Sequence, residues 1–130
     1  MSTFDLSMFD PSTAVAALAR DGTSEVIEGR SGPPVRIDGV TVGAPLMTAS
    51  APHRGELRPD GDELLYLISG RVAVVLDDGD EETVGIEERF ALEPGTACIV
   101  PRGVWHRVEV LEPSHLVHVT PGPGGGHRPL

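Results

Sequence analysis

Glycine and proline interrupt this chain so often that long regular elements are excluded from most of it. The 130 residues include 16 glycines and 12 prolines, which separate short runs of β-branched and apolar residues from residue 24 onward. This punctuation is typical of a domain built from many short strands. The spacing of the runs predicts an all-β sandwich or closed barrel. The expected strands are 24–28, 35–37, 40–50, 63–67, 71–76, 83–86, 89–92, 97–100, 106–110 and 115–120.

The two ends of the chain differ from this pattern. Residues 1–23 are expected to form an extension with a short helix, because a serine–threonine pair can cap the alanine-rich run 14–19. Residues 24–120 are expected to form the barrel, with a hairpin turn of the Asp-Gly kind at residues 77–80. The glycine- and proline-rich tail, residues 121–130, is expected to lack a regular element.

The charge balance limits the partners that the protein can have. The formal net charge is −10 at pH 7, from 20 acidic and 10 basic residues, which argues against binding to nucleic acid or to an anionic membrane. No apolar run approaches the length of a membrane span, and the amino-terminal residues lack the pattern of a signal peptide. The single cysteine, Cys98, is expected to be a buried free thiol. These features predict a cytoplasmic protein.

Two stretches have a residue spacing that composition does not explain. In the first, six residues separate Glu63 from Gly70. In the second, GTACIVPRGVWH, five residues separate Gly95 from the Pro-Arg-Gly sequence 101–103, and two more precede His106. Together the two stretches resemble parts of the two sequence motifs of the cupin family.

The resemblance to cupins covers about residues 48–120. It implies a double-stranded β-helix, which is the jelly-roll or cupin barrel, with a pocket for a small-molecule ligand inside. It also implies that Glu63 and His106 are metal ligands on facing strands.

A charged residue, Glu63, begins a strand that is otherwise apolar. Side chains alternate along a strand, so Glu63 shares one face with the leucines at 65 and 67, while Leu64, Tyr66 and Ile68 share the other face. If the face of Glu63 lines the barrel, its carboxylate needs a cation, a proton or a metal ion as a partner. The apolar outer face predicts a homodimer, because small cupins usually pair through such strands.

The chain departs from the family where cupins have a His-x-His sequence. The corresponding positions hold Glu56 and Arg58, and Val110 replaces the asparagine of the second motif. Two alternatives follow for the site. Glu56 could join Glu63 and His106 as the ligands of one divalent cation. Alternatively, no cofactor is bound, and the Arg58 guanidinium takes the place of the metal by bridging Glu56 and Glu63.

Four other histidines have several possible roles. His53 could restore a nitrogen ligand if the chain bends near it. His115 and His118 lie on opposite faces of the last strand, and one of them could face the barrel, although ordinary surface or core positions are expected. His127 could be solvated or part of a lid over the pocket.

Three functional classes remain open, because one fold hosts many reactions. The first is a metal-dependent enzyme, similar to the cupins that isomerise, cyclise, decarboxylate or oxygenate small metabolites, with Glu63, His106 and Glu56 as ligands. The second is a metal-free enzyme, similar to the sugar epimerase and isomerase branch of cupins, in which His106 is the general acid or base, Glu63 tunes it, and Arg58 with Glu56 binds the ligand. The third is a non-catalytic module that binds or senses a small molecule. We expect the isomerase, cyclase or lyase class, acting on a small metabolite.

Overall fold

The computed structural model describes residues 4–29 and 35–130, and all regular elements within these ranges are strands. Residues 1–3 of the expected extension and residues 30–34 of the expected barrel lie outside the described residues. The strands are β1 (Ala14–Ala19), β2 (Ser24–Glu28), β3 (Gly39–Gly43), β4 (Leu46–Met47), β5 (Glu56–Leu57), β6 (Glu63–Asp77), β7 (Glu87–Leu92), β8 (Ala97–Val100), β9 (Trp105–Gly122) and β10 (Gly126–His127). None of the described residues belongs to a helix that could cross a membrane.

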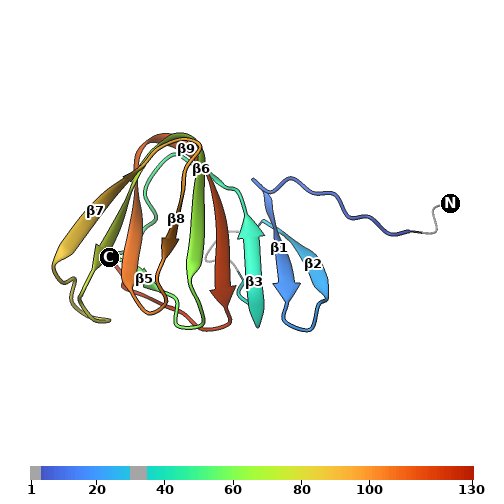
Figure 1. Cartoon of the computed structure of the whole chain (residues 1–130), viewed down its shortest axis with the longest axis horizontal. Coiled ribbons are helices and arrows are strands. Elements are labelled where there is room, and N and C mark those ends of the chain that lie inside the picture. The colour runs from blue at the N-terminus through green and yellow to red at the C-terminus, as the bar shows by residue number, and fades with distance from the viewer. Residues whose placement is uncertain (1–3, 30–34) are drawn as a thin grey trace.

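Two long strands, β6 and β9, form the frame of the barrel (Figure 1). They pair antiparallel along most of their length, with register shifts between Leu67 and Val72. Strand β6 also pairs with β7 and β8, and β9 also pairs with β3, β4 and β5. The irregular region contains Gly70, whose φ of 94° favours glycine and whose missing side chain leaves room for Pro113 and Ser114. The long strands can therefore bend and enclose a core.

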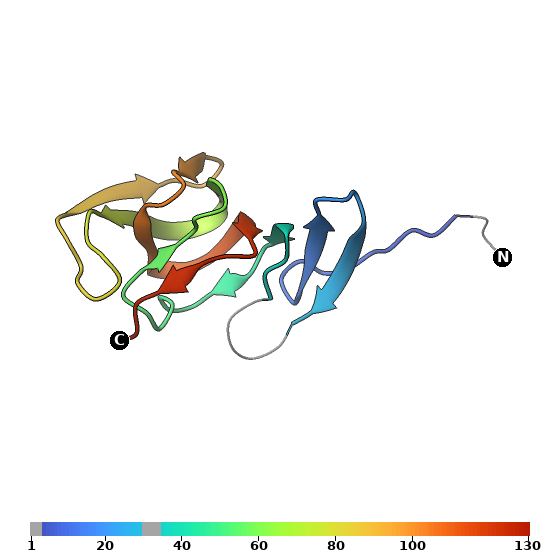
Figure 2. The ribbon, with the colours of Figure 1, turned by 90° about the horizontal axis from the view of Figure 1, so that it is seen from below.

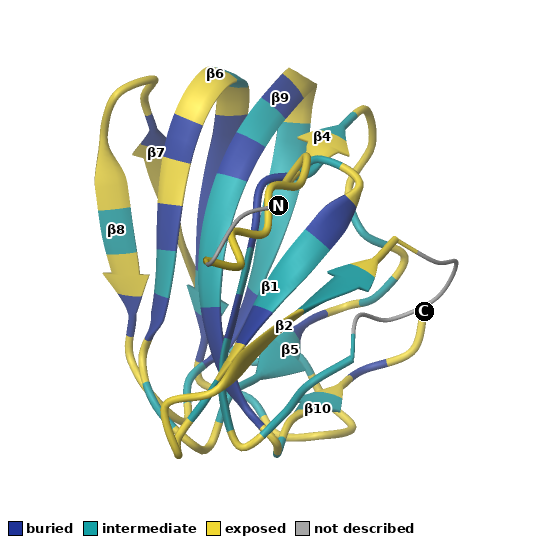
Figure 3. Ribbon diagram, turned by 90° about the vertical axis from the view of Figure 1, so that its right-hand side faces the viewer, coloured by how far each residue is buried: buried dark blue, intermediate teal, exposed yellow. Residues whose placement is uncertain are grey.

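The core lies between the long strands and their neighbours. Its buried residues are Leu65, Leu67, Val72, Val74, Leu92, Val100 and Leu116. Burial is concentrated in β6 and β9, whereas β2 has no buried residue and β8 has only one (Figure 3). The all-β barrel predicted from the sequence is confirmed.

The helix expected within residues 14–19 is wrong, because these residues form β1. Strand β1 pairs with β2 on one side and with β3 on the other, so both neighbours supply backbone hydrogen-bond partners. A helix of six residues would have no such support, and short helices are marginal in water even when rich in alanine. The β1–β2 hairpin lies beside the barrel, and the chain from residue 4 extends away from it (Figure 2).

Three further expectations about elements are wrong. The loop between β6 and β7 is longer than an Asp-Gly turn and includes residues 83–86, because Asp77 and Asp78 accept the backbone N–H groups of Gly85 and Ile86. Residues 35–37 precede β3 without forming a strand. The tail contains β10, which pairs with β5, and so it does form a regular element.

Candidate functional site

A cavity of about 630 Å³ lies inside the barrel. Apolar side chains from β4, β6 and β9 form part of its wall, and charged and imidazole groups form the rest. The charged and imidazole side chains that line it are Arg36, His53, Glu56, Arg58, Glu63, His118 and His127. A pocket with an apolar wall and a few convergent polar groups is typical of a small-molecule site.

Three strands bring Glu56, Glu63 and His106 together, with Glu56 and Glu63 lining the cavity and His106 buried directly behind them. Glu56 lies on β5, directly opposite His106 on the neighbouring strand β9, and Glu63 is the first residue of β6. Glu63 and His106 are 3% and 1% exposed, which confirms that Glu63 points inward. The predicted site residues therefore form one cluster, together with Arg58.

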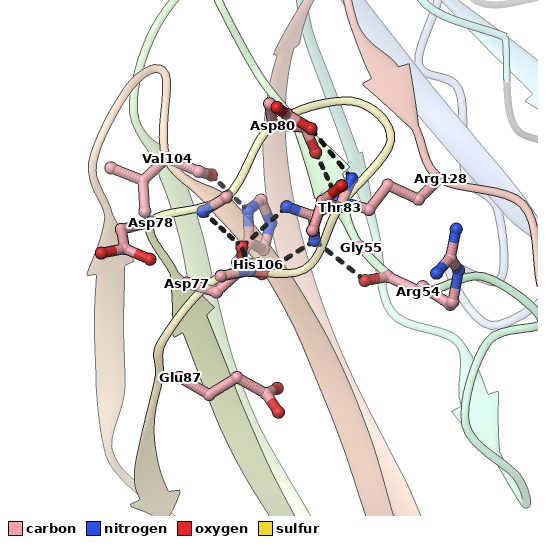
Figure 4. Close-up of polar contacts among 12 residues, drawn as sticks. Arg54, Gly55, Asp77, Asp78, Asp80, Thr83, Glu87, Val104, His106 and Arg128 are labelled. Carbon is pink, nitrogen blue, oxygen red and sulfur yellow. Dashed lines mark hydrogen bonds and ion pairs between the residues drawn. The ribbon is translucent and has the colours of Figure 1, made fainter.

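The hydrogen bonds of His106 fix its protons. Nδ1 lies 3.1 Å from the carbonyl oxygen of Val104, which can only accept, so Nδ1 carries a proton (Figure 4). Nε2 lies 2.9 Å from Oε1 of Glu63 and 3.3 Å from Oε1 of Glu56. A ring nitrogen between two carboxylates is a donor, so in the metal-free cluster His106 is an imidazolium.

The pKa values of the cluster agree with this geometry. Burial disfavours the charged form of His106, but the hydrogen bonds to Glu56 and Glu63 outweigh it and raise the pKa of His106 to about 10. Burial likewise opposes the ionisation of Glu56. The hydrogen bond from His106 and the charge of Arg58 outweigh that cost and lower the pKa of Glu56 to about 2. The cluster thus consists of two carboxylates, one imidazolium and one guanidinium.

Arg58 forms half of the bridge predicted for it. Its Nη2 donates to Oε2 of Glu56 at 2.9 Å, but Glu63 has other partners. Oε2 of Glu63 accepts a hydrogen bond of 2.6 Å from the hydroxyl of Thr120, and Oε1 is bound by His106. The Nε of Arg58 is buried and is the only such side-chain atom without a partner among the described residues. A buried donor without an acceptor is unfavourable, so a ligand with an oxygen acceptor would stabilise this site.

The same cluster has a donor set that fits a divalent cation. One ligand atom from each of Glu56, Glu63 and His106 lies within 4.8 Å of the others. Two carboxylates and one imidazole suit a hard or borderline cation. The Nδ1–H of His106 is bound to a carbonyl, as is usual for histidines that ligate through Nε2.

His53 is close to the cluster but presents the wrong nitrogen for ligation. Its Nδ1 accepts the backbone N–H of Gly55 at 3.1 Å, so the proton of the neutral ring is on Nε2. That nitrogen lies 3.9 Å from Oε2 of Glu56. Burial lowers the pKa of His53, which favours the neutral ring. In this tautomer, His53 turns an N–H toward Glu56 at a distance too long for a hydrogen bond, and it offers no lone pair for a metal ion.

Sequence reasoning did not identify the row of polar residues beside Glu63, although it allowed that one of His115 and His118 faces the barrel, and His118 does. Thr120 and Thr41 are opposite each other on β9 and β3, and Arg36 donates to Thr41 at 2.6 Å. Nδ1 of His118 lies 2.8 Å from the hydroxyl of Thr120. The signal that could have found this row is the alternation of β9, which places residues 118 and 120 on one face. His115, on the opposite face, instead contacts the carbonyl of Ala44.

The carboxyl-terminal tail covers part of the cavity. Residues 123–127 line the cavity, and the next residue, Arg128, is fully buried. Its guanidinium binds both carboxylate oxygens of Asp77, at 2.8 and 2.7 Å, and donates to the carbonyl oxygens of Arg54 and Asp80 (Figure 4). It also lies 4.4 Å from the ring centroid of Trp105, as in a cation–π contact. Arg128 therefore anchors the tail.

Two other predicted features lie outside the cavity. Tyr66 and Ile68 are 37% and 43% exposed, which confirms an apolar outer face on β6. Cys98 is a free, half-buried thiol whose pKa is raised by burial, as expected for an unreactive cysteine.

Comparisons with known proteins agree with this architecture. A family model described as a cupin domain matches residues 48–120. No curated protein sequence matches the chain. Among solved structures, oxalate decarboxylase from Bacillus subtilis, described together with its Mn(II) centres, is 20% identical, with a TM-score of 0.54 over 68% of this chain and 23% of that chain.

Two other solved structures are similarly distant. Oxalate oxidase is 15% identical, with a TM-score of 0.51 over 67% of this chain and 45% of its own. Peruvianin-I from Thevetia peruviana latex, named a cysteine peptidase, is 17% identical, with a TM-score of 0.54 over 71% of this chain and 57% of its own. The chain thus spans less than two thirds of each of these proteins. At such identities the likeness concerns the fold.

Proposed function

Because this chain belongs to the cupin family, we propose that it is a small cupin enzyme that binds an anionic metabolite in its cavity and transfers protons there. The observation that carries the proposal is the cluster itself. The N–H of His106 is held between Glu56 and Glu63, next to an Arg58 guanidinium whose buried Nε has no partner among the described residues. This combination supplies a proton donor and a free hydrogen-bond donor at one place.

The charge of the site favours an anion. Arg36, Arg58 and the imidazolium of His106 exceed the two carboxylates by one positive charge, although the whole chain has a net charge of −10. Burial and the charge of Arg58 lower the pKa of Arg36, so two cations lie close together near the cavity. A ligand carboxylate would relieve that repulsion and accept from Arg58.

The reaction class follows from the groups that the cavity presents. An oxygen of the ligand bound to Arg58 would be stabilised as negative charge develops on it. His106 would donate its Nε2 proton as a general acid, and Glu63 would hold the ring in place. These roles support an isomerase, cyclase or lyase acting on a small carboxylic acid. A sensing module would bind the same ligand without turnover.

Calorimetric titration of metal-depleted protein with oxalate and with pyruvate tests the binding step. We expect saturable binding that is at least about tenfold weaker in Arg58→Met, since a charge-assisted hydrogen bond contributes roughly 1.5–3 kcal/mol. Arg102→Met is the matched control, because Arg102 is exposed and outside the cavity lining. An equal effect of both substitutions, or no binding of either acid by the wild-type protein, would contradict the proposal.

One observation favours a second candidate, a metal-dependent cupin. Glu56, Glu63 and His106 fit one divalent cation, and a structurally similar oxalate decarboxylase has Mn(II) centres. Such an ion would supply Lewis acidity to a bound oxygen. Nε2 of His106 would then be unprotonated, while its Nδ1–H would keep its hydrogen bond to the carbonyl oxygen of Val104. Arg58 counts against this candidate, because its charge adjoins Glu56.

Elemental analysis of purified, tag-free protein separates the two candidates. A stoichiometric metal that is lost in Glu63→Gln and in His106→Ala would support the metal-dependent enzyme. Absence of metal after incubation with excess divalent ions would support the metal-free one. Neither substitution introduces a larger side chain into the core. Circular dichroism of both variants checks that they are folded, so that a loss of metal is not caused by unfolding.

Self-association and location complete the proposal. The apolar outer face of β6, with Tyr66 and Ile68, supports a homodimer, and Ile68→Lys should convert it to a monomer in light scattering. A wild-type monomer would contradict this part. The cytoplasm remains the proposed location.

A further inference from the structure

The ring of His118 has a free nitrogen at the cavity, and the hydrogen bonds around it show which one. The hydroxyl of Thr120 has a single proton, which it donates to Oε2 of Glu63 at 2.6 Å. The same hydroxyl lies 2.8 Å from Nδ1 of His118, so it must accept there. Nδ1 therefore carries a proton, and Nε2 of the neutral ring has a lone pair.

No residue that the structure describes bonds to that lone pair. Among the described residues, Nε2 of His118 has no hydrogen-bond partner, and it is not a fully buried atom. The ring lines the cavity and leans over Gly43, the residue directly opposite it on β3. A side chain at Gly43 would have its Cβ 2.8 Å from Nε2, so glycine leaves the space that the ring occupies.

We infer that His118 is the proton-accepting residue of the cavity, held by a Glu63–Thr120 relay, while His106 on the other oxygen of Glu63 is the proton-donating residue. The inference deepens the proposed function and rests on it. A proton taken from the ligand would bind to Nε2 of His118, and the electron pair of the broken bond would stay on the ligand, next to Arg58. The new imidazolium charge would be stabilised through Nδ1–H, the Thr120 hydroxyl and the Glu63 carboxylate.

The surroundings of His118 favour the neutral ring that a base requires before the reaction. Burial and the charge of Arg36 lower the pKa of His118.

The test uses the ¹⁵N spectrum of the histidine rings at pH 7, without any ligand. We expect His118 to have a protonated Nδ1 and an unprotonated Nε2. Thr120→Val should remove this tautomer preference, and Thr120→Ser, which retains the hydroxyl, should preserve it. A protonated Nε2 in the wild-type protein, or a spectrum that Thr120→Val does not change, would overturn the inference.

Chemical labelling tests whether the lone pair can be reached. Diethyl pyrocarbonate modifies unprotonated imidazoles, and the exposed His127 is an internal reference. Mass spectrometry should find His118 labelled at no less than about a tenth of the rate of His127, and Gly43→Ala should reduce it at least fivefold by crowding the ring. A wild-type His118 that resists labelling would refute the assignment. Because neither measurement uses a carboxylic acid, failure here is distinguishable from failure of the oxalate and pyruvate titrations.

Discussion

Strand β6 begins and ends on a buried carboxylate, and the two ends differ in how completely their partners are satisfied. At the carboxyl end, Asp77 accepts two hydrogen bonds from Arg128 and two from backbone N–H groups. Arg128 donates as well to two carbonyl oxygens. At the amino end, the single N–H at Nε2 of His106 lies between Glu63 and Glu56, and Arg58 has a buried Nε for which residues 4–29 and 35–130 supply no partner.

This difference separates an ion pair whose polar groups are all satisfied from a cluster with an unsatisfied donor. Buried polar groups that are fully satisfied rigidify a fold, and those left incomplete are costly unless another molecule completes them. The Asp77–Arg128 pair fixes the tail and has no place for a ligand. The cluster around Glu63 faces the cavity, and a ligand oxygen would complete it.

The largest expected difference between the two ends concerns stability. Arg128→Met should lower the free energy of unfolding by about 3–5 kcal/mol, because it leaves the Asp77 carboxylate buried and unpaired. Arg58→Met, the matched substitution at the other end, should cost about 1 kcal/mol or less, since Glu56 keeps His106 as a partner. Urea unfolding measures both values.

A second variant separates the charge from the shape of Arg128. In Asp77→Leu/Arg128→Met, no charged side chain of this pair remains buried. Much of the stability that is lost in Arg128→Met should therefore return. If the double variant is no more stable than Arg128→Met alone, the Asp77–Arg128 pair is not what stabilises this end of β6.

Lowering the pH should reduce the free energy of unfolding that Asp77 contributes, by less than the Arg128→Met substitution does. The hydrogen bonds from Arg128, acting against burial, lower the pKa of Asp77 to about 2, from an ordinary value of 3.8. A lowered folded-state pKa stabilises the protein above pH 4, and that contribution is lost as the pH falls from about 4 to 2. The stability gap between wild type and Asp77→Asn should therefore narrow by roughly 2 kcal/mol over this interval. If the difference in the free energy of unfolding between wild type and Asp77→Asn stays constant from pH 6 to pH 2, the lowered pKa of Asp77 does not stabilise the fold.

Local sequence patterns predicted the Glu63 end better than the Asp77 end. The spacing of the apolar runs predicted a sandwich or barrel, and strand alternation placed Glu63 on the same face as two leucines. The resemblance to the cupin motifs implied that Glu56, Arg58 and His106 lie near Glu63, and those motifs occupy short stretches. The role of Arg128 was not predicted, since Asp77 lies 51 residues earlier and only the folded barrel brings the two together.

The same limit explains the other errors. The run 14–19 favours a helix by composition, but pairing with two strands overrides that preference. The Thr120–His118 row was missed because its importance comes from Glu63, which is far away in sequence. Non-local pairing therefore determines both the structural and the chemical features that short-range patterns do not indicate.

The smallest expected effect concerns metal binding at the Glu63 end of β6. Arg58→His removes a positive charge that is 2.9 Å from Glu56 and adds an imidazole near Glu63 and His106. Both changes favour a divalent cation, so the affinity for Mn²⁺ should rise by about tenfold in calorimetric titration. Arg58→Gln removes the charge without adding a ligand and should give a smaller gain. If neither variant binds Mn²⁺ more tightly than wild type, the Arg58 guanidinium is not what keeps a metal ion from this cluster, and the contrast between a complete and an incomplete end of β6 would need another cause.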